Sequence, residues 1–151
     1  MCSQKIKCLF GVKGTLFLYF ECTWTVLSIR GIKRVDEAVD VYHGILLSFP
    51  GQEAYIHTVV MDGLMKVGKF NAAIRVFRKA VAEGFTLNVV VYTVAIIGLF
   101  MGGRAGEAWS LFRQMKDVGL APTVHTYNVI VSGFVKVRDL NMVNLMLQEM
   151  I

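Results

Sequence analysis

The chain has 151 residues, 55% of them hydrophobic, and a formal net charge of +5. Its length corresponds to one domain, and the positive charge favours an acidic partner such as RNA or a membrane surface. The apolar run Thr15–Phe20 is far too short to span a bilayer, which excludes stable membrane insertion through this segment. Cys2, Cys8 and Cys22 match no zinc-binding spacing, so we expect reduced thiols and no metal.

The N-terminal segment, residues 1–22, matches no other part of the chain and is left unassigned. As far as Phe20 it contains Lys5, Lys7 and Lys13 and no acidic residue. This bias is similar to that of an organellar transit peptide, although such peptides are rich in arginine and this stretch has none. We therefore base no localisation on this segment alone.

The chain resembles itself when it is shifted by 35 residues. Residues 55–89 and 90–124 align without a gap and share ten identical positions: Thr58/Thr93, Val59/Val94, Gly63/Gly98, Leu64/Leu99, Gly68/Gly103, Ala73/Ala108, Phe77/Phe112, Arg78/Arg113, Gly84/Gly119 and Val89/Val124. A fixed period of this size is typical of a solenoid, in which each small unit contacts only its neighbours. Residues 125–151 form a third, truncated unit. Residues 23–54 form a degenerate unit, in which Val35–Tyr42 matches a second helix.

Each unit is predicted to contain a helix, a tight turn, a second helix and a loop. Apolar residues recur at helical spacing in both halves of a unit, and a glycine such as Gly68 or Gly119 stands where each helix should end. We therefore expect an all-α fold, a right-handed α-α superhelix of antiparallel helix pairs. The expected helices cover residues 55–67, 70–83, 90–101, 105–118, 125–137 and 139–150.

Four stretches of these units resemble the repeat of the pentatricopeptide repeat family. They are His125-Thr-Tyr-Asn128, Asp62-Gly-Leu-Met-Lys-Val-Gly68, Glu107-Ala-Trp-Ser-Leu-Phe112 and Gly119-Leu-Ala-Pro122. The resemblance extends from Val35 to Ile151. The register and its Tyr-Asn opening argue against tetratricopeptide repeats, which have a slightly shorter period and a different signature. The resemblance implies binding of single-stranded RNA at one base per unit, read by two or three side chains.

The resemblance also implies which residues would contact RNA. The base-reading positions are the fourth and thirty-fourth of a unit, which here are Thr58 with Asn88, Thr93 with Thr123, and Asn128 without a partner. By the same resemblance, the pair Thr58 with Asn88 implies a preference for adenine, and the pair Thr93 with Thr123 implies a leaning to purines. Asn128 implies a leaning to pyrimidines. The first position of each unit would stack on the base: Tyr55, Val90 and His125. The twelfth would contact phosphate and is Lys66 or Lys136, with Met101 as a departure.

Plain structural roles remain open for several of these residues. Thr58 and Thr93 could be helix N-caps, and Asn88 could be a turn residue. His125, Lys66 and Lys136 could simply be solvated surface residues. If so, the helices would still form, and only the assignment of these side chains to RNA would change.

Other functions also remain open. His43, His57 and His125 show no catalytic or metal-binding spacing, so we expect no enzyme, no cofactor and no small-molecule substrate. Three units would contact about three bases, too few for tight binding at about 1–3 kcal/mol each. The alternatives are therefore a protein-interaction scaffold with protein partners, or a non-functional fragment of a longer array. From the resemblance, we expect a role in organellar RNA processing, stability or translation, in the mitochondrion or alternatively the chloroplast.

Overall fold

The computed structural model describes residues 51, 53–66 and 68–151. In these residues the chain forms helices and no strand, in the order α4 Glu53–Lys66, α5 Phe70–Ala82, α6 Val89–Met101, α7 Ala105–Asp117, α8 Val124–Lys136 and α9 Leu140–Met150. Each observed boundary lies within two residues of the expected one, so the predicted all-α class is confirmed. The predicted N-terminal segment 1–22 and nearly all of the degenerate unit 23–54 lie outside the described residues.

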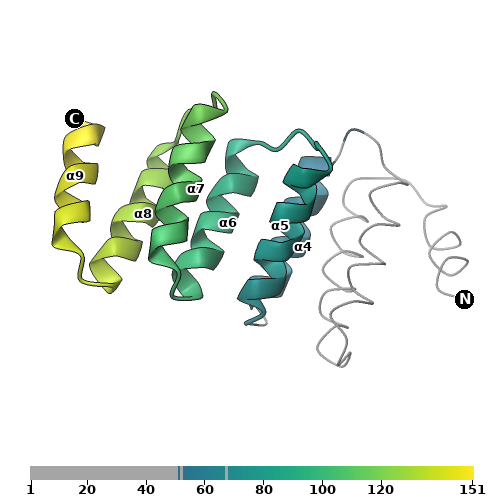
Figure 1. Ribbon diagram of the computed structural model, residues 1–151, viewed down its shortest axis with the longest axis horizontal. Helices are drawn as coiled ribbons and strands as arrows, with labels where there is room; N and C mark the ends of the chain where they lie inside the picture. Colours follow the sequence, from purple (N-terminus) through teal and green to yellow (C-terminus); the bar gives the residue numbers. More distant parts are fainter. Residues whose placement is uncertain (1–50, 52, 67) are drawn as a thin grey trace, which may run out of the picture.

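The helices form a superhelical array of two layers, and Figure 1 shows the helix pairs following one another along its length. Consecutive helices pack as antiparallel pairs, α4 with α5, α6 with α7, and α8 with α9. The first helices of the pairs also pack on one another, because α6 contacts both α4 and α8. The second helices α5, α7 and α9 contact mainly first helices. The array is therefore tighter along its layer of first helices, which we take as the concave side.

Ring contacts at the repeat period join each pair to the next. Phe77 on α5 meets the edge of Tyr92 on α6, with ring centroids 5.1 Å apart. Phe112 on α7 meets Tyr127 on α8 in the same way, at 5.5 Å. Edge-to-face ring pairs of this kind stabilise a core by about 0.5–1.5 kcal/mol beyond the area they bury. This ring contact is thus repeated between neighbouring units.

The turn inside each helix pair requires one residue with a left-handed backbone. Gly68 and Gly103 supply it with φ values of 76° and 74°, and Arg138 occupies the equivalent position with φ 59°. In each case the following N–H closes the turn, as Arg104 N–H does on Leu99 O at 2.8 Å and Asp139 N–H on Phe134 O at 3.0 Å. The third unit therefore forms the same turn with a residue that has a Cβ.

Replacing Arg138 with glycine should stabilise the protein by about 0.5–1 kcal/mol. A residue with a Cβ in the left-handed region costs roughly 1–2 kcal/mol, which exceeds the extra backbone entropy that glycine loses on folding. Urea unfolding of Arg138→Gly measures the effect. The reverse change, Gly103→Arg, should destabilise by a similar amount, and a lower midpoint for Arg138→Gly would contradict the prediction.

Candidate nucleic-acid interface

The loop residues of the predicted site cap the first helices. The Asn88 side chain accepts a hydrogen bond from Val91 N–H at 3.1 Å and forms the N-cap of α6. Thr123 caps α8 through a capping box with Thr126, in which each side chain accepts from the backbone N–H of the other at 3.2 Å. Both cap side chains belong to exposed residues. These two positions therefore lie at the N-terminal ends of neighbouring first helices.

The fourth residues of the units lie within the helices instead, in the second turn. The hydroxyl of Thr58 donates to Ala54 O at 2.8 Å, and that of Thr93 donates to Val89 O at 2.7 Å. Each is thus bonded to the carbonyl four residues earlier and neither is an N-cap. Thr58 lies five residues after the start of α4, and the N-cap of α6 is Asn88, so neither threonine caps its helix.

A base-reading role requires that Thr58, Thr93 and Asn128 all be accessible to RNA, and Thr93 is not. The Thr93 residue is 3% exposed. Its hydroxyl lies 3.0 Å from that of Thr126, which comes from the following unit and covers it. Thr58 is half-buried and Asn128 is exposed. The three equivalent positions therefore differ in access although they share one register.

The last unit brings three of the predicted site residues together. His125, Asn128 and Lys136 on α8 line one cavity of about 390 Å³. The cavity lies between α8 and α6, and its apolar wall includes Phe100 and Met101. A concave, mostly apolar site with a few convergent polar groups is the usual form of a ligand site. A flat, partly polar molecule of the size of a nucleobase suits this space.

The other predicted contact residues are accessible to different extents. At the first position of their units, Tyr55 is 39% exposed and Val90 is 54% exposed. Lys66 forms an ion pair with Asp62 one turn earlier, at 2.7 Å. Met101 at the equivalent position is 56% exposed and lies at the cavity. A phosphate would compete with Asp62 for Lys66, and would find no charge at Met101.

Two features of this face were missed from the sequence. Thr126 is fully buried and lies between Thr93 and Thr123, and Ser132 lines the cavity one turn from Asn128. Both are small polar residues on α8, so no composition or spacing signal separates them from ordinary helix residues.

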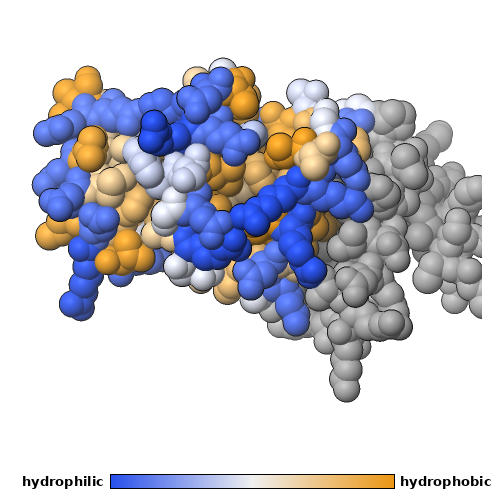
Figure 2. Space-filling view, viewed as in Figure 1, coloured by the Kyte–Doolittle hydropathy of each residue, from blue (hydrophilic) through white to orange (hydrophobic). Residues whose placement is uncertain are grey.

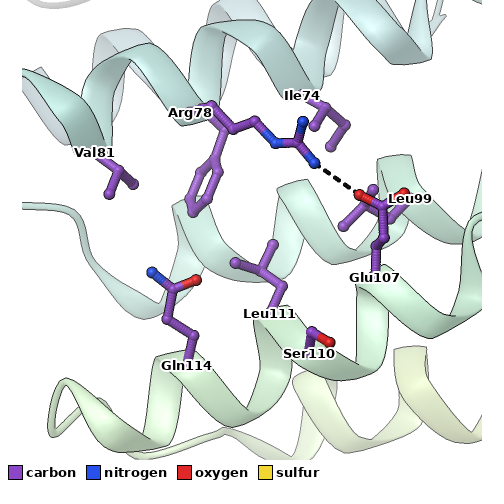
Figure 3. A pocket seen from close by; sticks show the side chains of 9 residues that line it. Ile74, Arg78, Val81, Leu99, Glu107, Ser110, Leu111 and Gln114 are labelled. Carbon is purple, nitrogen blue, oxygen red and sulfur yellow. Dashed lines mark hydrogen bonds and ion pairs between the residues drawn. The ribbon is translucent and has the colours of Figure 1, made fainter.

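The opposite face has a smaller groove, between α5 and α7. It measures about 240 Å³, and Figure 3 shows the Arg78 and Glu107 side chains paired across its mouth, at 2.7 Å. Glu107 also accepts from Arg104, which holds the pKa of this carboxyl below its ordinary value. Figure 2 shows hydrophilic side chains spread over this face with apolar ones between them. The groove holds no residue that the sequence singled out for RNA.

Two further properties of the described residues bear on function. Among residues 51, 53–66 and 68–151, no group of three His, Cys, Asp or Glu side chains is arranged to hold a metal ion. In the same part of the chain, none of the helices has the length and apolar character needed to cross a bilayer.

Comparison with known families adds an independent observation. A family model described as the PPR repeat family matches residues 87–136. A second model, described as the PPR repeat, matches residues 55–85 and 125–151. A search of curated proteins found no match. Together the two family models cover most of the chain, and their matches span the helices from α4 to α9.

Proposed function

Because the chain belongs to the pentatricopeptide repeat family, whose members generally bind single-stranded RNA, we propose that it binds such RNA in a sequence-specific manner along its first helices. The observation that carries the proposal is the cavity between α6 and α8, which His125, Asn128 and Lys136 line together. These are the stacking, base-reading and phosphate positions that the repeat register indicates for one nucleotide.

The chemistry of these side chains suits one nucleotide. The amide of Asn128 both donates and accepts, so it matches the mixed edge of a pyrimidine. The imidazole of His125 offers a flat face for stacking, which is worth about 1–3 kcal/mol per base on an aromatic ring. The ammonium of Lys136, at the far end of the cavity lining, suits a backbone phosphate. In the preceding units, Thr58 with Asn88 and Thr93 with Thr123 are the equivalent pairs.

We propose that this binding acts in organellar RNA processing, stability or translation, in the mitochondrion or alternatively the chloroplast. The support is the family resemblance. The chain would position RNA without transforming it, and protein partners would complete the assembly. Imaging a fluorescent fusion of the full chain tests the location. A signal spread through the cytosol, with RNA binding intact, would contradict the organellar part of the proposal alone.

Changing Lys136 to alanine should weaken binding to all RNA sequences alike. Loss of one phosphate contact should also reduce the slope of log affinity against log salt by about one. Lys66→Ala should have a smaller effect, because Lys66 is already paired with Asp62. Binding of random RNA pools to the full chain at two salt concentrations measures both slopes. An effect of Lys136→Ala that depends on RNA sequence would contradict the assignment to phosphate.

Changing Asn88 to aspartate should move the base preference of its unit from adenine towards guanine, by about tenfold, within the range for a good base contact. A carboxylate only accepts, which suits the N1–H and N2–H₂ donors of guanine and repels the N1 acceptor of adenine. Aspartate also keeps the N-cap on Val91 N–H, so the fold should be unaffected. The measurement is binding of RNAs varied at one nucleotide, with the unit placed in a longer array. An unchanged preference with intact binding would make Asn88 a capping residue only.

A further inference from the structure

Three threonine hydroxyls form a hydrogen-bonded chain between two neighbouring units. Thr123 Oγ1 lies 3.1 Å from Thr126 Oγ1, and Thr126 Oγ1 lies 3.0 Å from Thr93 Oγ1. Thr126 is fully buried and Thr93 nearly so, whereas Thr123 is exposed. This hydrogen-bonded chain of side chains therefore runs from the surface to the second turn of α6, and it joins the two residues that the repeat register assigns to one base.

The number of hydroxyl protons fixes which group donates and which accepts in each of these hydrogen bonds. A threonine hydroxyl has one proton, and that of Thr93 is donated to Val89 O at 2.7 Å. Thr93 can then only accept from Thr126, so the Thr126 proton points to Thr93. Thr123 must in turn donate to Thr126, which also accepts from Thr123 N–H. The proton of each of the three hydroxyls is thus used inside the protein.

The preceding unit provides an internal comparison. Thr58 occupies the position of Thr93, and Val91 occupies the position of Thr126 one repeat earlier. The Thr58 hydroxyl makes the same bond to the carbonyl four residues back, at 2.8 Å. Among the described residues, however, no second hydroxyl contacts it, and Thr58 is half-buried where Thr93 is buried. Thr58 and Thr93 therefore differ in burial and in hydroxyl partners. The following units differ at the matching position, which is Val91 after the unit of Thr58 and Thr126 after the unit of Thr93.

We infer that Thr126 closes the base-reading position of the unit 90–124, so that this unit holds a nucleotide without selecting its base through Thr93. Thr126 affects specificity as a positioning residue, because it acts through Thr93 and Thr123. Within the described residues, specific reading is then left to the unit of Thr58 with Asn88 and to Asn128. The inference rests on the proposed function. It adds that the base of the nucleotide bound by the unit 90–124 is not selected.

The test uses the full chain and an RNA selected by it, varied at one nucleotide at a time. Thr93→Val and its matched variant Thr58→Val each delete one hydroxyl at nearly constant shape. We expect Thr58→Val to change the base preference at its nucleotide at least fivefold. Thr93→Val should change the preference at the next nucleotide less than twofold. A fivefold change with Thr93→Val would overturn the inference.

A second measurement needs no RNA. Thr93→Val, Thr126→Val and the double variant form a cycle of urea unfolding experiments. We expect the double variant to lose less stability than the sum of the single variants, with a coupling of about threefold or more in the unfolding constant. Strict additivity would show that the hydroxyls are not paired and would overturn the inference. If the unmodified chain binds no RNA, the proposed function fails and the inference fails with it, whereas coupling in this cycle would still confirm the threonine chain.

Discussion

Replacing Gly133 with alanine should destabilise the fold by about 1 kcal/mol, although alanine is the better helix former. A Cβ on Gly133 in α8 would lie 2.5 Å from Cγ and Cδ1 of the Phe100 ring on α6, closer than real Cβ contacts allow. The ring is held by an edge contact with Phe134, with centroids 5.2 Å apart. Overpacking of this kind costs roughly 1–3 kcal/mol, which outweighs a helix-propensity gain of about 1 kcal/mol.

Gly106→Ala is the matched control for this change. Gly106 is also helical, in α7, but a Cβ there would meet nothing within 4 Å. It should therefore stabilise the protein, by up to about 1 kcal/mol. Urea unfolding of both variants decides the matter, since the two changes have the same chemistry and opposite expected signs. Equal stabilisation by both would mean that α6 and α8 do not approach as closely as described.

Lowering the pH from 6.5 to 4 should destabilise the protein by up to about 3 kcal/mol through His57. The residue is fully buried, and removal from water lowers the pKa of its imidazole from 6.5 to about 4, against the opposing charge of Glu53. The unfolded chain therefore binds the proton first as the pH falls. The free energy of unfolding is therefore highest above pH 6.5 and falls progressively down to pH 4. The size of the fall is set by the difference in the pKa of His57 between the folded and unfolded chain.

His57→Phe separates this effect from the titration of carboxylates. The substitution keeps a ring against Phe85, which the imidazole meets edge-on at 5.2 Å, and removes the proton site. The free energy of unfolding of His57→Phe should then be nearly flat between pH 6.5 and about 5. A slope as steep as that of the unmodified chain would contradict the assignment to His57.

The helices could be predicted from the sequence because their limits are set locally. Glycines fall at the turns with the 35-residue period, and Gly68 and Gly103 take the left-handed backbone that such turns need. The third unit was predicted from its register alone, and its turn still forms with Arg138 in that conformation. Tertiary packing of the pair evidently outweighs the strain at one residue.

The accessibility of the site could not be predicted in the same way. Register placed Thr58 and Thr93 in equivalent positions, and their bonds to Ala54 O and Val89 O are indeed equivalent. Burial of Thr93 depends on Thr126, which lies 33 residues further along the chain. A pattern within one unit carries no information on such a contact. The positions of His125 and Lys136 came from the repeat register, but part of the apolar wall of their cavity comes from α6.

The ring pairs between units also determine how the array comes apart. Phe77 and Phe112 each hold the next first helix through a tyrosine, whereas the equivalent position on α9 is Leu147, which is 47% exposed. In a linear array, stability is a sum over neighbours, so the unit with the fewest contacts opens first. Met146 is the buried residue of α9. Amide hydrogens should accordingly exchange with solvent fastest in α9 and become progressively more protected through α8 to α6.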